Sequence, residues 1–271
     1  MRIFASGVRK LVGRPASIVT IGLLMGLLVL IIVATSTVAQ RSPAAEDGAR
    51  AILLVAFPGA YDLILSFILG LGGLFAVIYG AAIAGSEWGW GTLKNAVARG
   101  ESRSRYMLLG FASIAAMVAL GLAITFVVGI GAAVVGANIA GVSTAGVGDA
   151  ATLGRLPNEL ARGWFAITEE ASLGFAIATL ARSQLAGIGA GIAFYFGEAF
   201  ATIFLPDVVK YLPFAVAQAS IGISGTGAGG GGGPAVAAAL PADTALLLVG
   251  AWLVGSLVVA LGFTERAEIT G

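Results

Sequence analysis

Long runs of apolar residues, separated by short polar stretches, make up most of this chain. A run of about 20 apolar residues is long enough to cross a bilayer as a helix. We therefore predict an all-α membrane protein with a single transmembrane domain over residues 1–271. Six membrane-spanning helices are expected at about residues 16–39, 61–85, 107–135, 161–181, 185–205 and 243–263.

The segments outside these runs have patterns of their own. Residues 1–14 place apolar side chains at helical spacing between basic ones, which is typical of an amphipathic helix on the membrane surface. A cleaved signal peptide is the competing interpretation, because Thr37-Val38-Ala39 resembles a cleavage site, but the apolar run is longer than in most signal peptides. We expect loops at 136–157 and at the glycine-rich tract Gly225–Gly233. Residues 207–223 are too apolar for a free loop and too often broken by proline to span, which favours a re-entrant or surface-lying outer helix.

Composition supports membrane insertion and excludes several kinds of site. Hydrophobic residues make up 58% of the chain and charged residues only 11%, whereas a soluble domain needs far more surface charge. Cysteine and histidine are both absent, which excludes disulfides, zinc or haem sites built on those ligands, and Ser-His or Cys-His catalytic pairs. The charges are spread along the chain and form no basic patch, so we expect no nucleic-acid partner.

The distribution of cationic residues predicts the orientation of the chain. With the N-terminus in the cytosol, the cytosolic segments hold Arg2, Arg9, Lys10, Arg14, Lys94, Arg99, Arg103, Arg105, Arg182 and Arg266. The outer segments hold only Arg41, Arg50, Arg155, Arg162 and Lys210. Because cytosolic loops carry the excess of Lys and Arg, both termini are expected in the cytosol.

The most informative polar segment is the connector 86–106, which lies between the second and third expected spans. Its apolar residues Trp90, Leu93 and Val97 form one stripe of a short helix. Its charged residues are Glu87, Lys94, Arg99, Glu101, Arg103 and Arg105. One interpretation is that these cations only set the topology and contact anionic lipid. The alternative is that the short helix binds a partner protein.

Two groups of residues in this connector carry a family resemblance. The pattern Glu87-x-x-x-Gly91-Thr92-Leu93, followed by Arg99-Gly100-x-Ser102-Arg103, resembles the first cytosolic connector of bacterial ABC-2 type permeases, the membrane subunits of ATP-binding-cassette exporters. The layout is also similar, with a basic interfacial helix, six spans and a long outer segment before the last span. Further similarity runs from Glu198 through Leu205-Pro206 to Tyr211-Leu212-Pro213, and at Phe263-Thr264-Glu265-Arg266.

The resemblance implies that residues 86–105 form a coupling helix, which rests in a groove of a separate ATPase subunit. Trp90, Leu93 and Val97 would then provide an apolar face, and Glu87, Arg99 and Arg103 would orient it against charged groups of the ATPase. Gly100 would end the helix in a left-handed conformation. The residues assigned to coupling are Glu87, Trp90, Gly91, Thr92, Leu93, Val97, Arg99, Gly100, Ser102 and Arg103.

The same resemblance implies a division of labour between subunits. Lys10, Lys94 and Lys210 are the only lysines, and none lies in a Walker A loop, so ATP and Mg²⁺ are expected in the partner and no cofactor in this chain. The chain is therefore not expected to be an enzyme. The implied partners are an ABC ATPase subunit, a second copy of the permease or a paralogous permease, and the lipid bilayer. The implied location is the inner (plasma) membrane of a bacterial or archaeal cell.

Three carboxylates fall within expected spans: Glu169, Glu170 and Glu198. Carboxylates at membrane depth usually face a protein interior or a watery cavity, so these residues are candidates for the translocation pathway. Glu169 and Glu170 could instead lie near the outer interface, and Glu198 could make an interhelical hydrogen bond. Two rival functions follow: an ion-coupled carrier or channel that uses these glutamates, and a structural subunit of a larger membrane complex.

Overall fold

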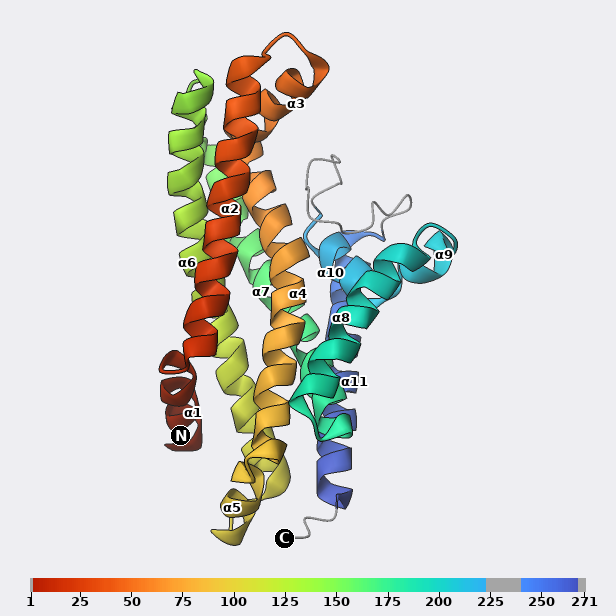
Figure 1. The fold of residues 1–271 in the computed structure, drawn as a ribbon. Coiled ribbons are helices and arrows are strands. Elements are labelled where there is room, and N and C mark those ends of the chain that lie inside the picture. The colour runs from red at the N-terminus through yellow and green to blue at the C-terminus, as the bar shows by residue number, and fades with distance from the viewer. Residues whose placement is uncertain (1, 223–239, 268–271) are drawn as a thin grey trace.

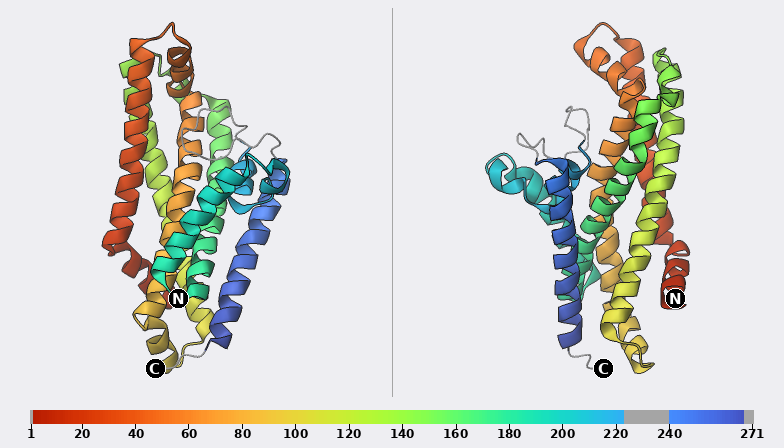
Figure 2. Two further views of the ribbon diagram at one scale, coloured as in Figure 1. Left: turned by 45° about the vertical axis from the view of Figure 1, so that its right-hand side comes forward. Right: turned by 180° about the vertical axis from the view of Figure 1, so that it is seen from behind.

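A computed structural model of the protein describes residues 2–222 and 240–267, which form a bundle of helices that run alternately up and down (Figures 1 and 2). The α-helices are α1 (Arg2–Val12), α2 (Pro15–Arg41), α3 (Glu46–Val55), α4 (Gly59–Gly89), α5 (Thr92–Ala98), α6 (Arg103–Ala140), α7 (Ala150–Ala181), α8 (Gln184–Ala201), α9 (Pro206–Val209), α10 (Pro213–Ser220) and α11 (Ala242–Arg266). A short 3₁₀ turn, η1 (Ala145–Gly148), precedes α7. The described residues include no strand, which confirms the all-helical prediction.

Four of these helices are long and apolar enough to cross a membrane. They comprise Ser17–Arg41, Gly59–Gly89, Arg103–Ala140 and Ala242–Arg266. The other two expected spans also form helices, α7 and α8. They fall outside this set, because Glu169 and Glu170 in α7, and Gln184 and Glu198 in α8, make these helices less apolar. The structure thus supports a membrane protein, and the count of six spans stays a prediction.

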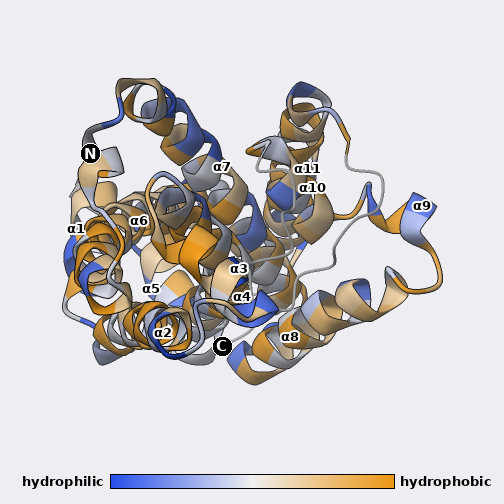
Figure 3. Cartoon of the chain, turned by 90° about the horizontal axis from the view of Figure 1, so that it is seen from above, coloured by the Kyte–Doolittle hydropathy of each residue, from blue (hydrophilic) through white to orange (hydrophobic). Residues whose placement is uncertain are grey.

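The outer surface of the bundle is apolar, as expected of helices that contact lipid. Seen from above, apolar residues lie on the outward sides of the peripheral helices as well as between them (Figure 3). Examples are Ile18 on α2, Val127 on α6 and Leu247 on α11, each more than 60% exposed. Side chains of this size rarely cover the exterior of a soluble protein so extensively.

The loop predicted at 136–157 is largely helical. Helix α6 continues to Ala140 and α7 begins at Ala150, so only residues 141–149 connect them. Gly141, with φ +70°, ends α6, and the Asp149 carboxylate caps α7 by accepting from the Thr152 amide at 2.9 Å. The prediction was wrong because small residues are as compatible with closely packed helices as with loops. The tract Gly225–Gly233 lies outside the described residues.

Helices α4 and α7 cross at the centre of the bundle with their backbones in close contact. A Cβ atom added at Gly80 would lie 2.1 Å from the Ala171 carbonyl oxygen, and one added at Gly174 would lie 2.0 Å from the Val77 carbonyl oxygen. Only glycine fits at these points, which is the small-residue packing typical of membrane helices. Helices α2, α6, α8 and α11 then pack around this pair.

The segments predicted to be cytosolic gather at one end of the bundle. Helices α1 and α5 and the last turn of α11 lie at the lower end in Figure 1, and α3 lies at the opposite end. The connector between α7 and α8 belongs to the same lower end, because the Arg182 guanidinium lies 5.3 Å from the Trp88 ring of α4 and 5.2 Å from the Phe263 ring of α11. We call this the α5 end of the bundle.

Candidate functional site

The connector between α4 and α6 is a helical turn held by two left-handed glycines. Gly91 has φ +65° and begins α5, and Gly100 has φ +88° and follows it. At the second glycine, the Gly100 amide donates to the Val97 carbonyl at 2.9 Å and the Glu101 amide donates to the Ala96 carbonyl at 3.2 Å. These two bonds form a Schellman motif, which ends a helix and turns the chain sharply. The predicted role of Gly100 in ending the helix is confirmed.

Glu87, in the last turn of α4, is the centre of the connector. Its side chain is buried, and its carboxylate accepts hydrogen bonds from the Lys10 ammonium of α1 at 2.6 Å and the Tyr106 hydroxyl of α6 at 2.6 Å. The Thr92 hydroxyl, at the start of α5, donates to the same carboxylate. One carboxylate therefore joins α1, α4, α5 and α6. The left-handed Gly91 turns the chain so that Thr92 reaches back to Glu87, which gives the Glu-x-x-x-Gly-Thr spacing a structural reason.

The apolar stripe of the connector is divided between two environments. Leu93 is only 1% exposed and packs in the core of the bundle, and Val97 is partly buried against that core. Trp90 is 65% exposed. The Arg14 guanidinium lies 5.0 Å from the centroid of the Trp90 ring. The expectation that all three residues form one outward apolar face is therefore wrong for Leu93, because this side chain packs in the core and holds α5 against the bundle.

Arg103 is directed toward α11. Its guanidinium donates to the carbonyl oxygens of Glu265 at 3.1 Å and Ala267 at 2.8 Å, where the last turn of α11 leaves carbonyls without helical partners. In return, the Glu265 carboxylate accepts from the Ser104 amide at 3.1 Å, at the start of α6. Each helix end thus caps the other, and the expected orientation of Arg103 toward a partner is wrong for this structure.

The outward side of the connector carries two exposed arginines. Arg99 and Arg105 are exposed beyond α5 and at the start of α6, and Asn95 and Ala98 are exposed beside them. Ser102 begins α6, and its hydroxyl oxygen accepts from the Arg105 amide at 3.2 Å. The connector therefore has an inner side bound to the bundle and an outer side that carries exposed cations and Trp90.

Sequence reasoning missed several residues that hold this site together. Lys10, Tyr106, Arg182 and Glu265 all bind or stack on the connector and its neighbours. Lys10 and Glu265 lie far from their partners in the sequence, so no local pattern could identify them. Tyr106 lies 19 residues from Glu87, and its place one turn into α6 is the only signal that could have been used.

The three glutamates of α7 and α8 are all buried inside the bundle. Glu169, Glu170 and Glu198 are at most 2% exposed. The alternative position of Glu169 and Glu170 near the outer interface stays a prediction, because burial among helices does not fix depth in the membrane. Both carboxylate oxygens of Glu169 lack a hydrogen-bond partner among the described residues, and Glu170 packs against Gly73 of α4. In the described part of the chain, none of the three forms an ion pair with a cation.

Glu198 has a defined structural contact. Its carboxylate accepts from the Ala215 amide at 2.6 Å and from the Phe214 amide at 3.3 Å, at the N-terminus of α10. This satisfies amides that the first turn of a helix leaves free, and fixes α10 against α8. Within residues 2–222 and 240–267, no three carboxylates converge as ligands for a metal ion.

Comparison with known proteins does not identify a relative. No protein-family model matches the chain. No curated protein matches it either. What the protein does must therefore be inferred from the geometry of the connector and of the buried glutamates.

Proposed function

We propose that this chain is the permease subunit of an ABC-2 type exporter, which moves its substrate using ATP hydrolysis in a separate ATPase subunit. The observation that carries the proposal is the two-sided connector. Its inner side is bound to α1, α4, α6 and α11, and its outer side exposes Trp90, Arg99 and Arg105 at the end of the bundle. A short helix attached in this way can transmit a displacement caused by a partner to several helices at once.

The outer side has the chemistry of a protein interface. Tryptophan and arginine are enriched in such interfaces, and an exposed aromatic ring beside a cation fits an acidic groove with an apolar floor. Surface cations that only set the topology require no ordered helix and no aromatic residue. A binding surface therefore explains more of the connector than anionic lipid alone.

The inner side supports transmission by rigid-body movement. A displacement of α5 would act through Glu87 on α1 and α6, and through Arg103 on the last turn of α11. In this proposal α5 lies in the cytosol, α7 and α8 complete six spans, and two permeases pair with two ATPases. Closure of the ATPases on nucleotide would then switch a central cavity from inward- to outward-facing.

The test is capture of the tagged chain from native membranes, followed by mass spectrometry and assay of ATP hydrolysis. The wild-type chain should bring down an ABC ATPase, and the double variant Arg99→Glu/Arg105→Glu should lose both the ATPase and substrate-stimulated hydrolysis. Arg41→Glu, an exposed charge reversal in the last turn of α2, is the matched control and should behave as wild type. An intact complex in the double variant would remove the basis for the coupling assignment.

The buried glutamates favour one other function, an ion-coupled carrier or channel. Three buried carboxylates without a cation among the described residues cannot all be ionised without a large cost, so protons or another cation would neutralise them. In vesicles that lack any ATPase, transport driven by an ion gradient, and lost in Glu170→Gln, would support this function. Transport that requires ATP and its partner would exclude it.

A further inference from the structure

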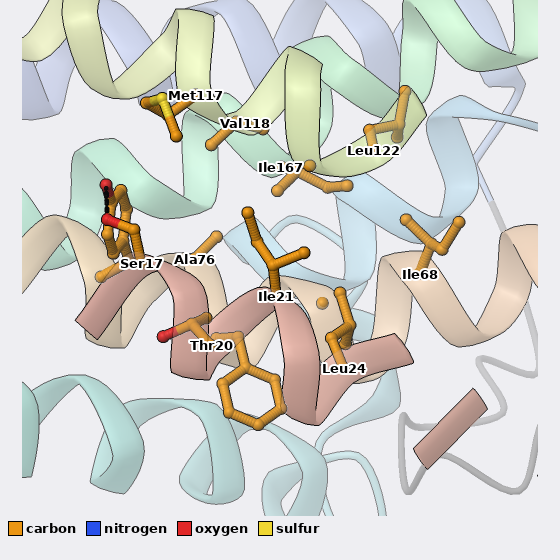
Figure 4. Close-up of a pocket in the computed structure, with 14 residues that line it drawn as sticks. Ser17, Thr20, Ile21, Leu24, Ile68, Ala76, Met117, Val118, Leu122 and Ile167 are labelled. Atoms are coloured by element: carbon orange, nitrogen blue, oxygen red, sulfur yellow. Dashed lines mark hydrogen bonds between the residues drawn. The ribbon is translucent and has the colours of Figure 1, made fainter. Parts of the chain in front are cut away.

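An apolar cavity of about 70 Å³ lies between α2, α4 and α6, partly open to the outside of the bundle (Figure 4). Its walls include Leu24 of α2, Gly72 of α4, and Met117 and Gly121 of α6. Its few polar groups include the hydroxyls of Ser17 and Tyr79, which bond each other at 2.8 Å. With those hydroxyls paired and the remaining walls almost entirely carbon, the cavity suits a hydrocarbon chain and does not suit an ion or a polar solute.

The residues that line the cavity extend along α4 over about the thickness of one membrane leaflet. Along α4 its lining extends from Ile68 to Tyr79, and eleven residues at 1.5 Å each correspond to about 16 Å. The hydrocarbon core of a bilayer is about 30 Å thick, so one leaflet contributes about half of that. Ser17 lies in the first turn of α2, which places the cavity in the leaflet nearer the α5 end. Because the cavity is partly open to the outside of the bundle, a lipid of that leaflet can lay an acyl chain along it and fill the cavity with part of that chain.

A cation lies beyond the polar end of the cavity, at the level expected for a lipid phosphate. The Arg14 guanidinium donates through Nη1 to the Ser86 hydroxyl at 3.3 Å, and its buried Nη2 has no hydrogen-bond partner among the described residues. Ser86 is seven residues beyond Tyr79 on α4, or about 10 Å closer to the α5 end. Arg14 also precedes α2, whose N-terminus carries partial positive charge.

We propose that one anionic phospholipid binds at this place, with its phosphate on Arg14 and one acyl chain in the cavity between α2, α4 and α6. The cavity by itself would accept an acyl chain from any lipid, and Arg14 selects the anionic headgroup. Because Arg14 joins α1 to α2, the lipid fixes the angle between the surface helix and the first span. This inference requires only that the bundle lies in a membrane and does not depend on an ATPase.

Two variants test the two ends of the site separately. Arg14→Gln removes the cation, with Arg9→Gln, an exposed cation of α1, as its matched control. Gly121→Leu fills the cavity without a backbone clash, because a Cβ atom there would meet only Ile21, at 3.8 Å. Gly131→Leu on the same helix is its control, since a Cβ atom there has no neighbour within 4 Å.

The measurement is native mass spectrometry of the full chain, released from nanodiscs of equal parts phosphatidylglycerol and phosphatidylcholine. The wild-type chain should retain about fivefold more phosphatidylglycerol than phosphatidylcholine, the ratio expected from about 1 kcal/mol per cation near anionic lipid. Arg14→Gln should abolish the preference, Gly121→Leu should lower retention of both lipids, and the controls should match wild type. Equal retention of the two lipids by the wild-type chain, or wild-type behaviour of both variants, would overturn the proposal. Since no ATPase is present, failure of this test and failure of the exporter assignment are distinguishable.

Discussion

Replacing Glu87 with alanine should destabilise the α5 end of the bundle by about 3 kcal/mol. Hydrogen bonds to charged groups contribute about 1.5–3 kcal/mol each, and loss of one member of a buried ion pair costs about 3–5 kcal/mol. The lower end of that range applies, because the Lys10 side chain is 38% exposed and can turn toward water. At about 2–4 °C per kcal/mol for a chain of this size, the unfolding temperature should fall by about 6–12 °C.

The assay is thermal unfolding in detergent, followed by tryptophan fluorescence. Trp88 and Trp90 lie in the connector and contribute two of the four tryptophan signals. The control is Glu46→Ala, which removes a carboxylate that also lies 2.6 Å from its cation, Arg50, but with both side chains more than 70% exposed. Exposed pairs contribute about 0–1 kcal/mol, so this control should shift the unfolding temperature by less than about 4 °C.

The two ion pairs differ in burial and in the number of additional donors, not in length. If Glu87→Ala and Glu46→Ala lowered the unfolding temperature equally, the claim that Glu87 joins four helices would fail. A double-mutant cycle of Tyr106→Phe with Glu87→Ala isolates the hydrogen bond from the Tyr106 hydroxyl to the Glu87 carboxylate. A coupling energy near zero would show that the hydrogen bond between Tyr106 and Glu87 contributes nothing to the free energy of unfolding.

Three further predictions concern single positions. Gly174→Ala should force α4 and α7 apart and cost about 1–3 kcal/mol, seen as a lower unfolding temperature, whereas Gly70→Ala, with open space around it, should not. Glu198→Ala leaves buried amides of α10 without an acceptor at a cost of about 1–3 kcal/mol and should speed hydrogen exchange over 213–220, with Glu198→Gln intermediate. Gly100→Ala places a side chain at φ +88° and should lower the free energy of unfolding by about 1–2 kcal/mol, measured by denaturant unfolding. An unchanged denaturation midpoint would contradict the claim that this backbone conformation strains an alanine.

The positions of the long helices could be predicted from the sequence because hydropathy depends on the local run of residues. Helices α2, α4, α6 and α11 each contain the span expected for them and extend beyond it at both ends. Periodicity gave no comparable guide at 136–157, where glycine and alanine fit a loop and a packed helix equally well. The Asp149 cap that begins α7 was present in the sequence and could have been used.

The candidate site could be predicted in its location but not in the direction of its side chains. The spacing of Glu87, Gly91 and Thr92 marked the connector, and the left-handed Gly100 followed from its place after the apolar stripe. The inward orientation of Glu87 depends on Lys10, which is 77 residues away, and no local pattern contains that contact. Leu93 likewise belonged to an amphipathic stripe whose buried side is decided by the helices packed against it.

Arg99 and Arg103 show why this distinction affects any test of coupling. Both belong to the same motif, but Arg103 caps the carbonyls of α11 and Arg99 is exposed. A charge reversal at Arg103 would place a carboxylate against those carbonyls and disturb the bundle whether or not a partner binds. A reversal at Arg99 changes only the outer side of the connector. A loss of activity at Arg103 therefore reports on the fold of the bundle, and only a loss at Arg99 and Arg105 reports on a partner.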